Sequence, residues 1–140
     1  IFYIDLYSRA VGLGGEEKPY IKRIGSIMDL SGYNVALRDV LSNFWRKQLP
    51  IRMIFDSITT LLLYNKFGTV ARFLHMVFGR LKAVEAVSLF LIDEGAHEEG
   101  EITTLMSMVD AIIEIRVKND EKYLRYKSEF VDCGWLPYKL

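Results

Sequence analysis

The sequence predicts an α/β fold, in which a mostly parallel sheet has helices on both faces and is closed by an antiparallel hairpin. Two observations predict this class. Short apolar runs of strand length alternate with longer segments whose apolar residues recur at helical spacing, as in βαβ units. Near the end of the chain, apolar and charged residues alternate with the two-residue period of half-exposed strands.

The first third of the chain is expected to contain one strand and one helix. Residues 1–5 are apolar and β-branched, and the glycine-containing segment 6–15 that follows indicates a loop. Residues 34–48 place Leu, Val, Phe and Trp side chains on one face of a helix. Pro50 ends this helix because proline cannot continue the hydrogen-bonding pattern.

The next segment predicts a strand, a turn and a helix. Residues 51–55 are mostly apolar and too few for a helix. Asp56 and Ser57 supply an oxygen side chain that can cap the helix expected at about residues 58–64. Gly68 separates this helix from a longer one, whose apolar stripe ends at Val84.

The second half is expected to alternate in the same way before it becomes antiparallel. Residues 87–92 indicate a buried strand, which an acidic loop at 93–100 ends, and a helix should follow. Residues 111–117 and 123–127 then predict a hairpin. The tail from residue 135 can add an edge strand, interrupted by Pro137.

Composition limits the classes of function. With 140 residues, the chain is expected to form a single domain, residues 1–140. Eighteen basic and 18 acidic side chains cancel, so charge does not indicate a nucleic-acid partner. The apolar runs are far shorter than the roughly 18 residues that span a membrane. We therefore expect a soluble, cytoplasmic protein, which also suits its single cysteine, Cys133. Because Ile1 opens directly into a strand, we expect the chain to be part of a longer protein.

Acidic residues follow each expected parallel strand. Asp5, Asp56 and the pair Asp93 and Glu94 all lie at carboxyl ends. Ligands of open α/β sheets bind at that edge. The pattern therefore predicts a ligand site there, although it does not identify the ligand.

Residues 51–61, with the sequence IRMIFDSITTL, resemble the Walker B segment of RecA-superfamily ATPases, closest to the KaiC-like and RadA-like proteins common in archaea. The resemblance extends in order through residues 73–75, 80–82, 94–99 and 110–116. It covers about residues 1–116. The order of these segments is more specific than any one of them, and it implies an incomplete RecA-like core.

The resemblance implies ATP and Mg²⁺ as ligands. By resemblance, Asp56 holds Mg²⁺ through water, and Ser57 either contacts the water shell of the metal or shares the helix cap. The alternative for Asp56 is that it only caps the helix. Glu94 resembles the polar sensor near the γ-phosphate. Asp93 departs from the threonine often found beside that sensor and adds negative charge.

A phosphate loop of the form GxxxxGK[ST] is missing from this sequence. Residues 12–19 contain glycines, but two glutamates precede the lysine and a proline follows it, so an ordinary loop is expected. The resemblance implies that the missing piece lies upstream of Ile1 and includes the phosphate loop and the catalytic glutamate. Two other outcomes stay open: the two strands beside the gap close directly, or another chain fills the slot. This chain alone would then not hydrolyse ATP, and the sequence does not decide whether it is an enzyme.

The hairpin offers Arg125 and Lys127 for the charge clamp that, in the family, reaches the nucleotide of the neighbouring subunit. The basic pair and glycine expected just after them are replaced by Ser128, Glu129 and the residues that follow. The alternative is a solvated strand face. By resemblance, the partner is a second copy, bound through the nucleotide edge.

Three functions therefore remain open. The first is the latter part of a KaiC-like ATPase or ATP-driven switch, with Asp56 and Glu94 at its site. The second is a degenerate, non-hydrolysing member that acts as a regulatory or interaction subunit. The third is an unrelated small doubly wound domain whose acidic strand ends bind a metal or a polar ligand, as in phosphoacceptor domains.

Overall fold

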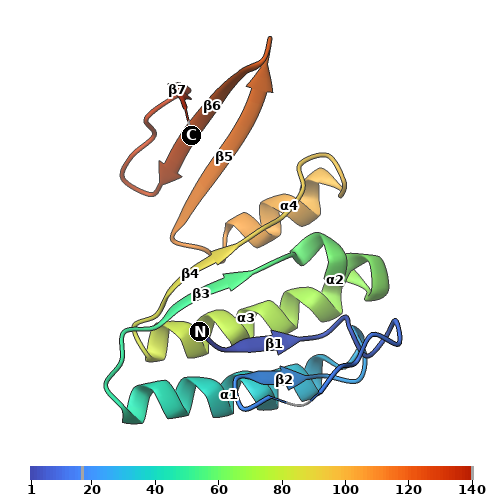
Figure 1. Ribbon diagram of the computed structural model, residues 1–140. Helices are drawn as coiled ribbons and strands as arrows, with labels where there is room; N and C mark the ends of the chain where they lie inside the picture. Colours follow the sequence, from blue (N-terminus) through green and yellow to red (C-terminus); the bar gives the residue numbers. More distant parts are fainter. Residues whose placement is uncertain (17, 140) are drawn as a thin grey trace. The chain divides into compact units, whose positions relative to one another are not determined.

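The computed structural model describes residues 1–16 and 18–139. Glu17, in the glycine-containing loop, and Leu140, in the tail, lie outside the described residues. The chain divides into two compact units, Ile1–His97 and Glu98–Leu140. Figure 1 shows the elements of each unit.

The first unit contains two parallel strand pairs and three helices. In chain order its elements are β1 (Tyr3–Asp5), β2 (Ile21–Arg23), α1 (Leu30–Arg46), β3 (Arg52–Phe55), α2 (Ile58–Tyr64), α3 (Phe67–Ala83) and β4 (Val87–Phe90). Strand β1 pairs with β2, and β3 pairs with β4. Helix α1 contacts both β1 and α3, and α2 contacts α3.

The predicted mostly parallel sheet with helices on both faces is wrong. Within the described residues, the strands form two separate parallel pairs and one three-stranded antiparallel sheet, with no extended parallel sheet flanked by helices. The parallel strands are only three or four residues long, and β1 does not join β3 in one sheet. Apolar alternation indicates that a segment is extended, but it does not determine how many strands join by hydrogen bonds.

Two elements begin where the sequence analysis did not place them. Strand β2 was not predicted, and its three residues lie in a segment assigned to no element. Helix α1 begins at Leu30 rather than near residue 34. Its N-cap is Asp29, whose carboxylate accepts a hydrogen bond from the backbone N–H of Gly32 at 2.8 Å. An acidic residue just before an apolar position was the local signal for this start.

Aromatic side chains from two helices and two strands join the core of the first unit. Tyr33 on α1 packs edge-on against Phe55 on β3 and Phe73 on α3, with ring centroids 5.8 and 5.4 Å apart. Phe55 also stacks on Phe90 of β4, which in turn receives the edge of Phe78 from α3. These contacts fix the paired strands β3 and β4 against both long helices.

The second unit consists of α4 (Glu99–Met106) and an antiparallel sheet of β5 (Ala111–Lys118), β6 (Glu121–Ser128) and β7 (Leu136–Tyr138). The hairpin predicted from alternation is confirmed, with Lys118 opposite Glu121. Its turn residues Asn119 and Asp120 both have positive φ, 51° and 61°, as type I′ turns require. Pro137 lies within the edge strand β7, where a missing N–H is tolerated.

Burial differs between the two units. Among the described residues, every buried apolar side chain except Leu105 lies in the first unit. On β5, the side chains of Ile113, Ile115 and Val117 are each more than half exposed. The main hydrophobic core of the chain therefore lies within residues 1–97.

Replacement of Leu74 should test this core. Its side chain is 0% exposed, and we expect Leu74→Ala to lower the free energy of unfolding by about 2–5 kcal/mol through lost burial and the cavity left behind. Met76 on the same helix is 49% exposed, so Met76→Ala should cost only about 0.5 kcal/mol. Urea unfolding followed by circular dichroism compares the two variants. Equal losses would contradict this assignment of the core.

Candidate functional site

The carboxyl end of β3 leads directly into α2. Phe55 is buried, Asp56 is exposed, and the peptide bond between Asp56 and Ser57 is cis. Ser57 is the N-cap of α2, because its hydroxyl oxygen accepts a hydrogen bond from the Thr60 N–H at 3.2 Å. Its hydroxyl also lies 3.1 Å from the Thr60 hydroxyl. Ser57 therefore supplies the hydrogen-bond acceptor for a backbone N–H in the first turn of α2.

Asp56 does not act as this cap. Within the described part of the chain, its carboxylate makes no hydrogen bond and no ion pair. Asp56 lines a pocket of about 190 Å³, together with residues that include Asp5, Tyr7, Ser57 and Thr60. Asp56 thus lines this pocket with a carboxylate that is unpartnered among the described residues, and three of the other lining residues, Tyr7, Ser57 and Thr60, carry hydroxyl groups.

Asp5 lines the same pocket but is occupied by its own neighbours. One carboxylate oxygen accepts hydrogen bonds from the N–H groups of Tyr7 and Ser8, at 3.0 and 2.9 Å. The other oxygen lies 3.6 Å from Nε of Arg23 on β2. Partial burial raises the pKa of Asp5, but hydrogen bonds from Ser8 and Tyr7 and the charge of Arg23 outweigh it, so its pKa is lowered. Asp5 therefore holds the turn after β1.

Glu94 lies in the turn after β4, and its side chain is exposed. This turn is tied to α2 by two hydrogen bonds: the Ile58 N–H donates to the Leu91 carbonyl at 2.8 Å, and the Asp93 N–H donates to the Thr59 hydroxyl oxygen at 2.8 Å. The carboxyl ends of β3 and β4 are thus connected. Thr59 was missed by the sequence analysis, and its only signal was its place in the first turn of the helix after Asp56.

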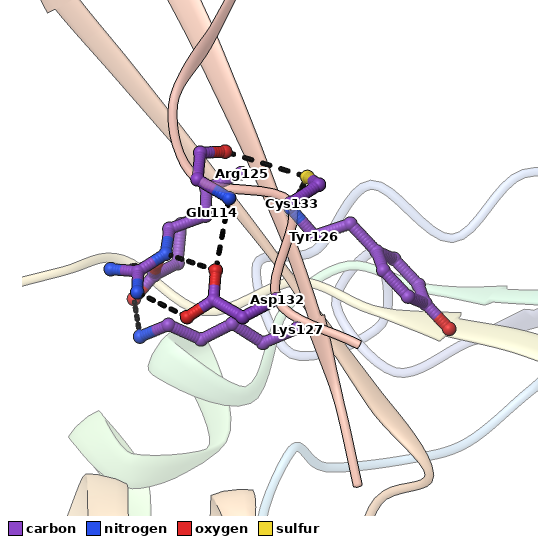
Figure 2. A network of polar contacts seen from close by, with 7 residues as sticks. Glu114, Arg125, Tyr126, Lys127, Asp132 and Cys133 are labelled. Carbon is purple, nitrogen blue, oxygen red and sulfur yellow. Dashed lines mark hydrogen bonds and ion pairs between the residues drawn. The ribbon is translucent and has the colours of Figure 1, made fainter. Parts of the chain in front are cut away.

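Arg125 and Lys127 belong to the second unit, and both are paired with carboxylates there (Figure 2). Arg125 binds the Asp132 carboxylate in a bidentate manner, with Nε 2.9 Å from Oδ1. Its Nη1 also lies 3.8 Å from Glu114. Lys127 Nζ lies 3.3 Å from the same Glu114 carboxylate. Both positive charges are therefore compensated within their own sheet.

The Arg125 pair changes the ionisation of its partner. The hydrogen bond from Arg125, followed by one from the Gly134 N–H, lowers the pKa of Asp132 to about 2. The same hydrogen bond raises the pKa of Arg125. Asp132 thus remains ionised at all but strongly acidic pH and keeps the guanidinium occupied.

Metal binding would rest on few protein ligands. Among the described residues, no group of three or more His, Cys, Asp or Glu side chains could hold a metal ion. Magnesium usually keeps several waters and binds one or two carboxylates together with the phosphates of its substrate. Asp56 can supply one such carboxylate.

None of the helices within residues 1–16 and 18–139 has both the length and the apolar character needed to cross a bilayer.

Comparison with known proteins places the chain in a family. Residues 9–115 match the family of unknown function DUF7504. The match covers most of the chain, so the protein belongs to this family. It includes β3, α2 and β4, and with them Asp56, Thr59 and Glu94. No curated protein matches the sequence.

Substitutions at the start of α2 should distinguish the capping residue, Ser57, from Asp56, whose carboxylate does not cap the helix. We expect Ser57→Ala to lower the free energy of unfolding by about 1 kcal/mol, because the Thr60 N–H loses its acceptor. Asp56→Ala should change it by less than about 0.5 kcal/mol, since this carboxylate is exposed and unpartnered within the described residues. Denaturant unfolding measures both. A larger loss for Asp56→Ala would contradict the assignment of Ser57 as the cap.

The Arg125–Asp132 pair predicts a specific titration. In the folded protein, the Asp132 carboxyl should titrate at about pH 2, and Arg125→Met should return its pKa toward the ordinary value of 3.8. Because the folded pKa is below the unfolded one, the stabilisation from this group is present above about pH 4 and is lost as the pH falls toward 2. Carbon-13 NMR of the side-chain carboxyl measures the titration. A pKa unchanged in Arg125→Met would contradict the pairing, and Lys127→Met serves as the milder control.

Proposed function

We propose that the first unit binds a Mg²⁺–nucleotide, with ATP as the nucleotide implied by the sequence resemblance, and that the chain is the latter part of an ATPase or ATP-driven switch. One observation carries the proposal: Asp56 lines a pocket and its carboxylate is unpartnered within the described residues, while the adjacent Ser57 caps α2. A carboxylate with no structural partner at the end of a strand is suited to a cation ligand.

In this proposal, Asp56 holds the Mg²⁺, and Ser57, Thr60 and Tyr7 contribute hydroxyl groups to the same pocket. When bound, Mg²⁺ neutralises charge on the phosphates of the nucleotide. Glu94 follows β4 and is exposed, so it can respond to the outer phosphate as a sensor. The sequence holds no phosphate loop, so hydrolysis is not assigned to these 140 residues by themselves.

One feature of the structure favours a second candidate, a regulatory or interaction subunit that binds nucleotide without hydrolysing it. Arg125 and Lys127, proposed to clamp a nucleotide in a neighbouring copy, are paired with Asp132 and Glu114. Releasing them would require breaking these ion pairs. A homo-oligomer formed through the nucleotide edge remains part of the first candidate. Cytoplasmic residence is proposed for both, because Cys133 is free and exposed.

Nucleotide titration of the full chain tests the magnesium role. We expect Mg²⁺–ATP to shift the backbone NMR signals of Ser57, Asp93 and Glu94. Asp56→Asn should weaken binding by roughly tenfold or more, because it removes the negative charge from the metal ligand. Asp120→Asn is the matched control, since Asp120 lies in the hairpin turn of the second unit.

Two results would overturn the magnesium role: equal affinity in Asp56→Asn and the natural sequence, or equal ATP affinity with and without Mg²⁺. Phosphate release measured on the same samples distinguishes the two candidates. Turnover that depends on Glu94 supports the ATPase. Binding without turnover supports the regulatory subunit.

A further inference from the structure

The residues that follow β4 are joined to the end of β3 and the start of α2 by three hydrogen bonds. The Leu91 N–H donates to the Phe55 carbonyl at 3.0 Å, and the Ile58 N–H donates to the Leu91 carbonyl at 2.8 Å. The third runs from the Asp93 N–H to the Thr59 hydroxyl oxygen at 2.8 Å. These bonds continue the β3–β4 pairing beyond the strands, to the residue before Glu94.

The third bond differs from the other two in its acceptor. The first two join backbone groups, so they do not depend on side-chain identity. The third requires an oxygen on the side chain of residue 59. Beyond Asp93 the loop is exposed at Glu94, Gly95 and Ala96, and Gly95 has a φ of +77°, a conformation that glycine adopts readily. The Thr59 hydroxyl therefore lies where the ordered strand connection passes into this exposed turn.

We propose that Thr59 is a positioning residue, whose hydroxyl oxygen holds the start of the 93–97 loop, and with it Glu94, beside the strand end that carries Asp56. The proposal deepens the nucleotide-binding function proposed above, because it names the side chain that couples its two carboxylates. Thr59 itself contacts the loop backbone at Asp93, and it acts on the ligand only through Glu94.

The physical reason is the cost of ordering a loop. A loop that is already held in place loses less conformational freedom when a ligand contacts it, so binding is stronger for the same contacts. Without the Thr59 oxygen, the Asp93 N–H loses its partner and the turn gains freedom. Ligand binding would then have to order Glu94, and this cost would lower the affinity for the ligand.

Two substitutions of Thr59 distinguish the effect of its hydroxyl group from the effect of its shape. Thr59→Val keeps the branched shape but removes the acceptor, whereas Thr59→Ser keeps the acceptor and removes a methyl group. Thr69→Val is the matched control, because Thr69 is an exposed residue in the first turn of α3. All three are made in the full chain, and their thermal unfolding is compared so that a general loss of stability is recognised.

Amide hydrogen exchange without ligand gives the direct readout. We expect the Asp93 amide to exchange roughly three- to tenfold faster in Thr59→Val, to be protected again in Thr59→Ser, and to be unchanged in Thr69→Val. The Leu91 amide should keep its protection in every variant, because its acceptor is a backbone carbonyl. Unchanged exchange at Asp93, or equal acceleration at Leu91, would overturn the proposal.

Mg²⁺–ATP titration then tests the coupling. We expect Thr59→Val to weaken affinity roughly three- to tenfold and Thr59→Ser to restore it. If exchange at Asp93 changes but affinity does not, the coupling is overturned while the nucleotide function stands. If the natural sequence does not bind Mg²⁺–ATP, the proposed function fails. The exchange result then still decides whether Thr59 holds the loop.

Discussion

Tyr33 on α1 meets Phe55 and Phe73 edge-on, and the position of the candidate site depends on these contacts. Phe55 is the last residue of β3, so a ring fixed in the core places the next residue, Asp56, at the surface of the strand end. Stacking of Phe55 on Phe90 extends the same constraint to β4. Offset and edge-on ring contacts are directional as well as apolar, and they therefore orient the strands instead of only burying them.

Local signals predicted individual elements well, whereas the pairing between them was not predictable from the sequence. The strand before Asp56 and the hairpin around Asn119 and Asp120 follow from short-range patterns, because strand length and alternation are properties of neighbouring residues. Strand β2 has only three residues and offers no period to detect. The separation of the parallel strands into two pairs depends on which backbone edges meet, and side-chain periodicity does not contain that information.

The candidate site was predicted in part. Sequence identified Asp56 and Ser57 but could not divide their roles, because either oxygen side chain can cap a helix, and the geometry assigns the cap to Ser57. Of the two carboxylates that pair with Arg125 and Lys127, one could have been predicted from the sequence and the other could not. Glu114 is directly opposite Arg125 in the hairpin register, so that partner was within reach of sequence reasoning. Asp132 follows β6 and meets Arg125 only because of the path of the chain after the strand.

The uneven burial of apolar side chains has a consequence for cooperativity. Residues 1–97 hold nearly all of the buried side chains among those described, whereas the β5–β7 sheet displays Ile113, Ile115 and Val117. Unfolding a segment that buries little surface absorbs little heat and responds weakly to denaturant. Calorimetry would therefore report mainly on the first unit. The unfolding of the hairpin would add only a small heat signal to that transition. A single melting temperature would describe the unit that carries Asp56, and it would say little about the one that carries Arg125.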